Sequence, residues 1–258
     1  MGLQILRVNT MTRAIRANVF CIGLLGVVFV FAPASAAEKL EVGASEASSP
    51  PKVGAISSPA GPQSLISNSQ RMAEFLREPA SKGTRHLANW ITATGDNHRL
   101  PFVIVDKVDA KVFVFDKDGR LGAVAPALVG LARGDYTVPG IGGRELSTIR
   151  PEERITPAGR FVAALGHDFG GTQILWVDYN TGIALHPVIT TNPKEHRLQR
   201  LATPTPLDNR ISFGCINVPA NFFKTAVAPA FTGTDGVVYI LPEAHSIGEI
   251  FSAYYEVD

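Results

Sequence analysis

Short apolar runs dominate the chain after Asp96. They have the length and the β-branched or aromatic content of strands, and residues that favour turns bound them. The pattern predicts strands over Phe102–Asp106, Lys111–Phe115, Leu121–Val129, Gly159–Leu165, Gln173–Asp178, Gly182–His186 and Gly236–Leu241. Several strands and few helices indicate a mainly β domain, either a sandwich or a barrel-like sheet.

Helical spacing of apolar residues precedes these strands. It predicts a helical pair within residues 71–98, with one helix over Arg71–Glu78 and a second over Thr84–Ala93. We expect this pair to cover one side of the main domain. The tail at residues 244–258 is assigned no function.

The first 36 residues have the pattern of a secretory signal peptide. Arginines precede an apolar run over Val19–Ala32, and Ala34-Ser35-Ala36 provides a small-residue cleavage site. The alternative is an uncleaved N-terminal anchor. Either way, we expect the rest of the chain to be exported to the periplasm or cell envelope, with no stable membrane span once the signal is removed.

Residues 37–70 are rich in Ser, Pro, Gly and Ala and contain few large apolar side chains. Such a segment buries too little surface to offset the entropy of ordering, so it is predicted to be a flexible linker. The whole chain has 258 residues, is 45% hydrophobic and carries a formal net charge of +1. This balance gives no basic excess for a nucleic-acid partner and no charged tail for a membrane surface, and it does not specify an oligomeric state.

One cysteine remains once the signal peptide, with Cys21, is removed. Cys215 follows Gly214, and a helix is predicted from Pro219 to Ala226. The positive end of that helix would favour the thiolate. A thiol beside glycine, with His186 supplied from another strand, has the residue types of a cysteine acyl-transfer enzyme.

Other chemistries are disfavoured. The six histidines show neither the helical pairing nor the cysteine pairing of a zinc site, so no metal and no cofactor are predicted. His196 is a competing base, but its charged neighbours indicate a solvated position, and His167 is expected at an exposed hairpin tip. The chain has no glycine-serine-glycine nucleophile elbow.

Two motifs in this order resemble the catalytic domain of the bacterial L,D-transpeptidases, also called YkuD-type domains. The first is Thr156-Pro157-Ala158-Gly159-Arg160-Phe161, and the second is Ser-X-Gly-Cys-Ile-Asn over Ser212–Asn217, with a histidine at a strand end between them. The resemblance covers roughly Pro101–Pro242 and places a catalytic domain at residues 99–243. It implies a β-sandwich or barrel-like fold, export, and a cysteine nucleophile that acts on peptidoglycan stem peptides.

The resemblance also implies roles for single residues. Cys215 corresponds to the nucleophile and His186 to the proton acceptor, while Gly214 and the Cys215 amide would form an oxyanion hole. The remaining expected site residues are the flanking polar Ser212 and Asn217, and Arg210, which is either a contact for a substrate carboxylate or a surface charge.

Three departures from the family pattern concern this region. Phe213 stands where a histidine or arginine is usual, and Pro187 follows the first histidine in place of a small residue. The separation of 29 positions between His186 and Cys215 is long, and the intervening loop is expected to form a wall of the active site.

The resemblance thus implies a peptidoglycan L,D-transpeptidase with a thioester intermediate on Cys215. An L,D-carboxypeptidase or endopeptidase would use the same site with water as acceptor. A third alternative is a wall-binding module that has kept the fold and lost activity, which the substitution Phe213 favours.

Overall fold

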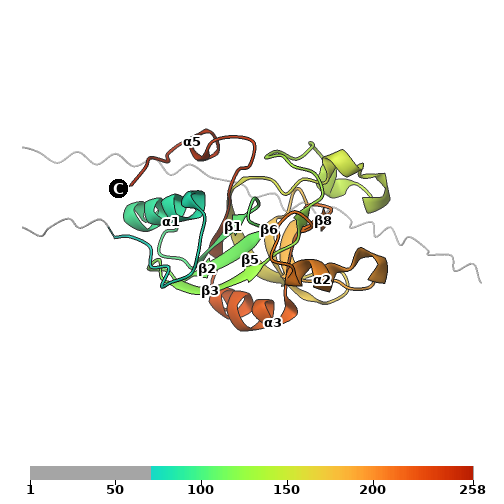
Figure 1. Ribbon diagram of the computed structural model, residues 1–258, viewed down its shortest axis with the longest axis horizontal. Helices are drawn as coiled ribbons and strands as arrows, with labels where there is room; N and C mark the ends of the chain where they lie inside the picture. Colours follow the sequence, from blue (N-terminus) through green and yellow to red (C-terminus); the bar gives the residue numbers. More distant parts are fainter. Residues whose placement is uncertain (1–70, 258) are drawn as a thin grey trace, which may run out of the picture. The chain divides into compact units, whose positions relative to one another are not determined.

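A computed structural model describes residues 71–257 of the chain. The expected signal peptide and linker lie outside these residues. Figure 1 shows the helices on either side of a mainly β core. The helices are α1 (Lys82–Thr94), η1 (Ile141–Gly143), η2 (Leu146–Thr148), η3 (Pro151–Glu153), η4 (Pro193–Glu195), α2 (Arg197–Ala202), α3 (Ala220–Phe222), η5 (Phe223–Val227), α4 (Ala228–Phe231) and α5 (Ile247–Ile250). The strands are β1 (Phe102–Asp106), β2 (Lys111–Phe115), β3 (Leu121–Pro126), β4 (Val129–Gly130), β5 (Gly159–His167), β6 (Gln173–Asp178), β7 (Ile183–Pro187), β8 (Arg210–Ser212), β9 (Ile216–Val218) and β10 (Gly236–Ile240).

The main sheet has eight strands in the order β3-β2-β1-β10-β5-β6-β7-β9, and β4 pairs with β8 in a second, two-stranded sheet. The β1/β10, β7/β9 and β4/β8 pairs are parallel, and the other neighbours are antiparallel. An antiparallel bridge joins Leu128, just after edge strand β3, to Asn217 of the opposite edge strand β9. The sheet is therefore nearly closed into a barrel, which confirms the predicted mainly β fold.

Side chains alternate between two cores along the central strands. Val103 and Val105 of β1 belong to one core, which the helical segment 220–231 covers, while Phe102 and Ile104 belong to the other, which α1 covers. The strands β1 and β10 are buried on both faces. This explains why they are continuous apolar runs in the sequence.

The first helix predicted from the sequence is wrong. Residues 71–78 form an extended segment in which Glu74 pairs with the β2–β3 hairpin, its N–H donating to Gly119 O at 2.9 Å and its carbonyl accepting from Leu121 N–H at 2.8 Å. Phe75 is buried against Phe113 and Phe115, so tertiary packing outweighs the helical spacing. The second predicted helix is α1, capped by the Ser81 hydroxyl and by Gly95 in the left-handed conformation.

Two further boundaries differ from the prediction. The strand expected over Leu121–Val129 ends at Pro126, and β4 resumes at Val129 to pair with β8. The helix expected from Pro219 extends to Phe231 through a π-helical turn, η5. The short strands β8 and β9, which flank Cys215, were not predicted because each is only three residues long. Among residues 71–257, none of the helices has the length and apolar character to cross a bilayer.

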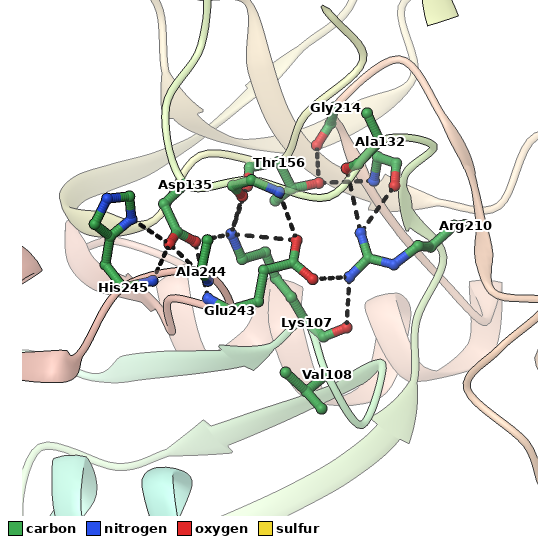
Figure 2. Close-up of polar contacts among 12 residues, drawn as sticks. Lys107, Val108, Ala132, Asp135, Thr156, Arg210, Gly214, Glu243, Ala244 and His245 are labelled. Atoms are coloured by element: carbon green, nitrogen blue, oxygen red, sulfur yellow. Dashed lines mark hydrogen bonds and ion pairs between the residues drawn. The ribbon is translucent and has the colours of Figure 1, made fainter. Parts of the chain in front are cut away.

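A buried lysine joins three segments that are far apart in the sequence (Figure 2). The Lys107 ammonium, just after β1, donates to Asp135 Oδ1 at 2.8 Å, to Gly134 O at 2.6 Å and to Thr156 O at 3.0 Å. Both charged side chains of the Lys107–Asp135 pair are fully buried. Although burial opposes it, hydrogen bonds from Lys107 and from the segment after β10 hold the pKa of Asp135 well below its usual range.

Asp135 and Glu243 extend this cluster to the segment after β10. The Asp135 carboxylate accepts from the backbone N–H groups of Glu243, Ala244 and His245, each at 2.9 Å. Glu243 in turn forms an ion pair with Arg210 of β8 and accepts from Gly134 N–H at 3.1 Å. The cluster therefore fixes the loop at residues 131–156, the chain after β10 and the strand before Cys215 relative to one another.

We expect Lys107→Met to destabilise the fold strongly. The substitution leaves the Asp135 carboxylate buried without its lysine, whereas Glu243 keeps Arg210. Breaking a buried pair in this way costs about 3–5 kcal/mol. Urea unfolding of wild type and variant measures the difference. Lys117→Met is the matched control because Lys117 pairs with Asp118 at the surface, and its loss should cost at most about 1 kcal/mol. Equal, small losses in both variants would contradict the structural role of Lys107.

Candidate active site

The parallel pairing of β7 with β9 brings His186 and Cys215 to neighbouring strands. Leu185 is level with Ile216 and His186 with Asn217. Cys215 immediately precedes β9, so the same register places it level with Ala184. Because alternate residues of a strand share a face, Ala184 and His186 lie on the same side of β7. His186 and Cys215, which are 29 positions apart in the sequence, are thus brought to two adjacent strands.

The His186 ring has a defined tautomer. Its Nδ1 lies 2.8 Å from Pro187 O, and a carbonyl oxygen only accepts, so Nδ1 carries the hydrogen. In the neutral ring, Nε2 then keeps its lone pair and is the atom able to take a proton. Burial is the main cause that lowers the pKa of His186, and the nearby Arg197 charge acts in the same direction, outweighing the hydrogen bond to Pro187. The ring is therefore an uncharged base at neutral pH.

The Cys215 thiol is not in the environment expected from the sequence. The predicted helix begins at Ala220, and strand β9 occupies the positions between it and the cysteine, so the helix end does not lie beside the sulfur. Burial raises the pKa of Cys215, with the Ala184 N–H and Arg197 opposing this only in part. Its Sγ lies 3.5 Å from Gly182 O, to which the thiol hydrogen donates. The resting site thus holds a neutral thiol and a neutral imidazole.

A tight turn carries Cys215 between β8 and β9. The Ser212 hydroxyl accepts from Gly214 N–H at 3.1 Å and donates to Cys215 O at 2.6 Å. Gly214 has a φ of 131°, and a Cβ there would lie 2.7 Å from Ile183 Cδ1 and 2.8 Å from Ile155 O. Glycine is therefore required at this position for both backbone conformation and space.

The two amides expected to form the oxyanion hole differ in availability. The Gly214 N–H is used inside the turn by Ser212. The Cys215 N–H donates no hydrogen bond to any residue in the part of the chain that the structure describes. The Cys215 amide is thus the donor that remains open to a developing oxyanion.

Thr156 of the first motif holds the same turn from the opposite side. Its hydroxyl donates to Gly214 O at 2.6 Å and accepts from Gly130 N–H at 2.8 Å, while its own carbonyl accepts from Lys107 (Figure 2). Sequence reasoning gave Thr156 no role beyond the motif. The structure makes it the link between the buried ion cluster and the cysteine turn.

Asn217 and Arg197 lie on the other side of Cys215. The Asn217 amide donates to Cys215 O at 3.3 Å and accepts from Arg197 Nη1 at 2.7 Å. Arg197 begins α2, inside the loop that joins His186 to Cys215, and was missed by the sequence analysis. The signal that was available was the expectation that this loop forms a wall of the active site.

Arg210 does not face the site as a free cation. Its Nη1 donates to the carbonyls of Gly130 and Ala132, and its Nη2 donates to Lys107 O and pairs with Glu243. These contacts leave neither terminal nitrogen for the substrate carboxylate that the sequence suggested, so its place is in the ion cluster. His196 and His167 are both exposed, as expected.

A narrow cavity of about 90 Å³ opens beside Cys215. Its lining is largely apolar and comes from the loop at 131–156, the turn before β7 and the cysteine turn: Thr137, Ile141, Gly142, Arg144, Leu146, Ile149, Ile155, Thr181, Gly182, Ile183, Phe213 and Cys215. The loop closes tightly, because a Cβ on Gly142 would lie 2.3 Å from Asn180 O. A larger cavity of about 680 Å³ lies between β2, β3 and the segment 222–230 and does not include Cys215.

Phe213, the unusual residue of the motif, has a cation over its ring. The Arg154 guanidinium carbon lies 3.9 Å from the ring centroid, and Arg154 also donates to Ile149 O at 3.2–3.3 Å. Phe213 is thus covered by the positive charge of an arginine from the loop at 131–156.

Comparison with known proteins gives matches among solved structures alone, since neither a family model nor a curated protein matches the chain. The helical cell shape determining protein Pgp2 from Campylobacter jejuni has a TM-score of 0.38 and 18% identity, over 57% of this chain and 49% of that one. An L,D-transpeptidase from Xylanimonas cellulosilytica has a TM-score of 0.33 and 15% identity, over 55% and 60%. The catalytic domain of the E. faecium L,D-transpeptidase has a TM-score of 0.31 and 19% identity, over 55% and 96%. Several of the similar structures are L,D-transpeptidases. The match spans about half the length of the Pgp2 chain.

We expect the alkylation of Cys215 by iodoacetamide in the native protein to have an alkaline midpoint. A raised pKa means that the thiolate forms only above the free value of about 8.5, so the rate should rise with a midpoint above that pH. Mass spectrometry of the Cys215 peptide across pH 6–10 measures the rates. Protein unfolded in urea is the control and should show a midpoint of about 8.5. A native midpoint below the unfolded one would restore the expectation of a stabilised thiolate.

Proposed function

We propose that this protein is an exported cysteine acyltransferase of the L,D-transpeptidase type that acts on peptidoglycan stem peptides. The observation that carries the proposal is the site itself: a thiol with an open backbone amide, on the strand next to a neutral histidine whose Nε2 has no hydrogen-bond partner among residues 71–257. The two sequence motifs support the same class of reaction. The signal peptide expected at residues 1–36 would deliver the enzyme to the periplasm.

The reaction begins with the neutral pair. As the sulfur attacks the carbonyl carbon of the stem's third residue, the thiol proton passes to His186 Nε2. The carbonyl oxygen becomes an oxyanion and accepts from the Cys215 N–H. The carbon–nitrogen bond then breaks, the departing amine takes the proton from His186, and a thioester remains on Cys215.

An acceptor completes the cycle. The amine of a second stem attacks the thioester, its proton passes through His186 to the sulfur, and a cross-link between third residues forms. If water attacks instead, the product is a trimmed stem and the enzyme is an L,D-carboxypeptidase. Both reactions use the same residues, because their first half-reaction is identical.

The wall-binding alternative predicts no chemistry at Cys215. The raised pKa of the thiol and the motif substitution Phe213 favour it. The geometry of the turn favours catalysis, because a purely structural cysteine does not require an open amide next to a base. Release of the terminal residue from a stem peptide distinguishes the two functions, because only the enzyme would catalyse it.

We expect Cys215→Ala to abolish release of the terminal residue from a tetrapeptide stem, because no other group in the site can form the thioester. The free energy of unfolding should change by no more than about 1 kcal/mol, because a small, partly exposed side chain is removed. Mass spectrometry of the stem peptide measures release, and urea unfolding measures stability. Retained activity with a large loss of stability would mean that Cys215 serves the core.

His186→Ala tests the base in the same assay. Loss of a general base should lower the rate about 10²–10⁴-fold. His196→Ala is the matched control, because it removes an exposed imidazole from the adjoining loop and should change the rate by less than about twofold. Equal effects of the two substitutions would contradict the role of His186.

A further inference from the structure

Arg197 is held beside the nucleophile with donors to spare. Its side chain is 12% exposed, its Nε pairs with Glu195 Oε2 at 2.5 Å, and its Nη1 donates to Asn217 Oδ1 at 2.7 Å. Its Nη2 has no acceptor among residues 71–257. A guanidinium has five N–H groups, and two are engaged here, so three remain for another ligand.

The two engaged donors fix the direction of the rest. Glu195 lies on the Nε side of the guanidinium, and Asn217 holds Nη1 while its own amide donates to Cys215 O. The charge is close enough to both reacting groups to influence them, since Arg197 lowers the pKa of both His186 and Cys215. Arg197 is therefore anchored to the cysteine turn through Asn217, two residues after Cys215.

Three other arginines lie on the cavity lining or close to the cysteine turn in sequence, and none of them hydrogen-bonds to a residue that itself hydrogen-bonds to Cys215. Arg144 pairs with Glu153 at 3.0 Å and also donates to Thr148 O. Arg154 stacks on Phe213 and donates to Ile149 O, and Arg210 belongs to the ion cluster. The charge of Arg197 lowers the pKa of both His186 and Cys215, whereas these three arginines are not among the causes of either pKa shift.

We propose that Arg197 binds the carboxylate of the departing residue and so restricts the enzyme to the last peptide bond of a stem. This inference rests on the proposed function. A departing C-terminal residue carries its α-carboxylate on the carbon next to the scissile nitrogen, so a cation beside the sulfur meets it when the thiol reaches the carbonyl. In an enzyme that cuts internal peptide bonds, the substrate has an uncharged amide at that position, and an arginine there would form no ion pair with it.

The test measures protection of Cys215 against iodoacetamide by two peptides, a tetrapeptide stem with a free C-terminus and the same peptide as its C-terminal carboxamide. In wild type, the free acid should half-protect at a concentration at least about tenfold lower than the carboxamide, as expected for loss of a charge-assisted contact. Arg197→Gln should remove this difference. Arg197→Lys, which keeps the charge without the planar fork, should restore part of it.

Lys194→Gln is the matched control, since it removes the same charge from an exposed position of the same loop. It should keep the difference within about twofold of wild type. Equal half-protecting concentrations for the two peptides in wild type would overturn the inference, and so would absence of protection by both. A difference that persists in Arg197→Gln would overturn it as well.

A second measurement separates this inference from the proposed function. The ratio of the rates with iodoacetate and iodoacetamide reports positive charge near the sulfur and requires no turnover. Arg197→Gln should lower this ratio about three- to tenfold, and Lys194→Gln should not. An unchanged ratio contradicts the placement of Arg197. Failure of the proposed function appears instead as no release of the terminal residue from either peptide, with protection by the free acid intact.

Discussion

The buried contact between the Lys107 ammonium and the Asp135 carboxylate determines how the rest of the site is arranged. Lys107 gathers Gly134, Asp135 and Thr156 around one charge, and Thr156 passes the constraint to the Gly214 carbonyl through its hydroxyl. The peptide group that ends in the Cys215 amide is thereby held from behind. A charge with no exposure to solvent thus fixes the direction of a neutral N–H group on the cysteine turn.

The electrostatics of the site favour an uncharged resting state. Burial raises the pKa of the thiol and lowers that of the imidazole, so both shifts oppose formation of an ion pair before substrate arrives. Arg197 opposes the shift at the sulfur but reinforces the one at the histidine. Under the proposed function, proton transfer would therefore accompany attack, when the forming bond and the oxyanion contact compensate for the separated charges. A free thiol in this state also resists oxidation, which proceeds through the thiolate.

The sequence predicted most of the strands because a short apolar run bounded by turn residues is a local signal. Three of the strands, β1, β2 and β6, have the bounds expected from their apolar runs. The first helix was wrong because Phe75 is buried by contacts with a hairpin about 40 residues away, which spacing alone does not reveal. Arg197 and Lys107 were missed for the same reason: each acts across the fold, through partners that are distant in the chain. Arg210 was misjudged in the opposite way. Because it is close to Cys215 in sequence, a contact with substrate was expected, but its side chain is engaged by the buried Glu243.

The bridge between Leu128 and Asn217 closes the sheet, and Asn217 is also the residue that contacts both Arg197 and the Cys215 carbonyl. The residue that closes the sheet is therefore also the residue that connects Arg197 to the cysteine turn. If the proposed function holds, a molecule in which this bridge is open would also lack the contacts that Asn217 makes with Arg197 and with the Cys215 carbonyl. Under the proposed function, one backbone bridge would then serve both the closure of the fold and the timing of its chemistry.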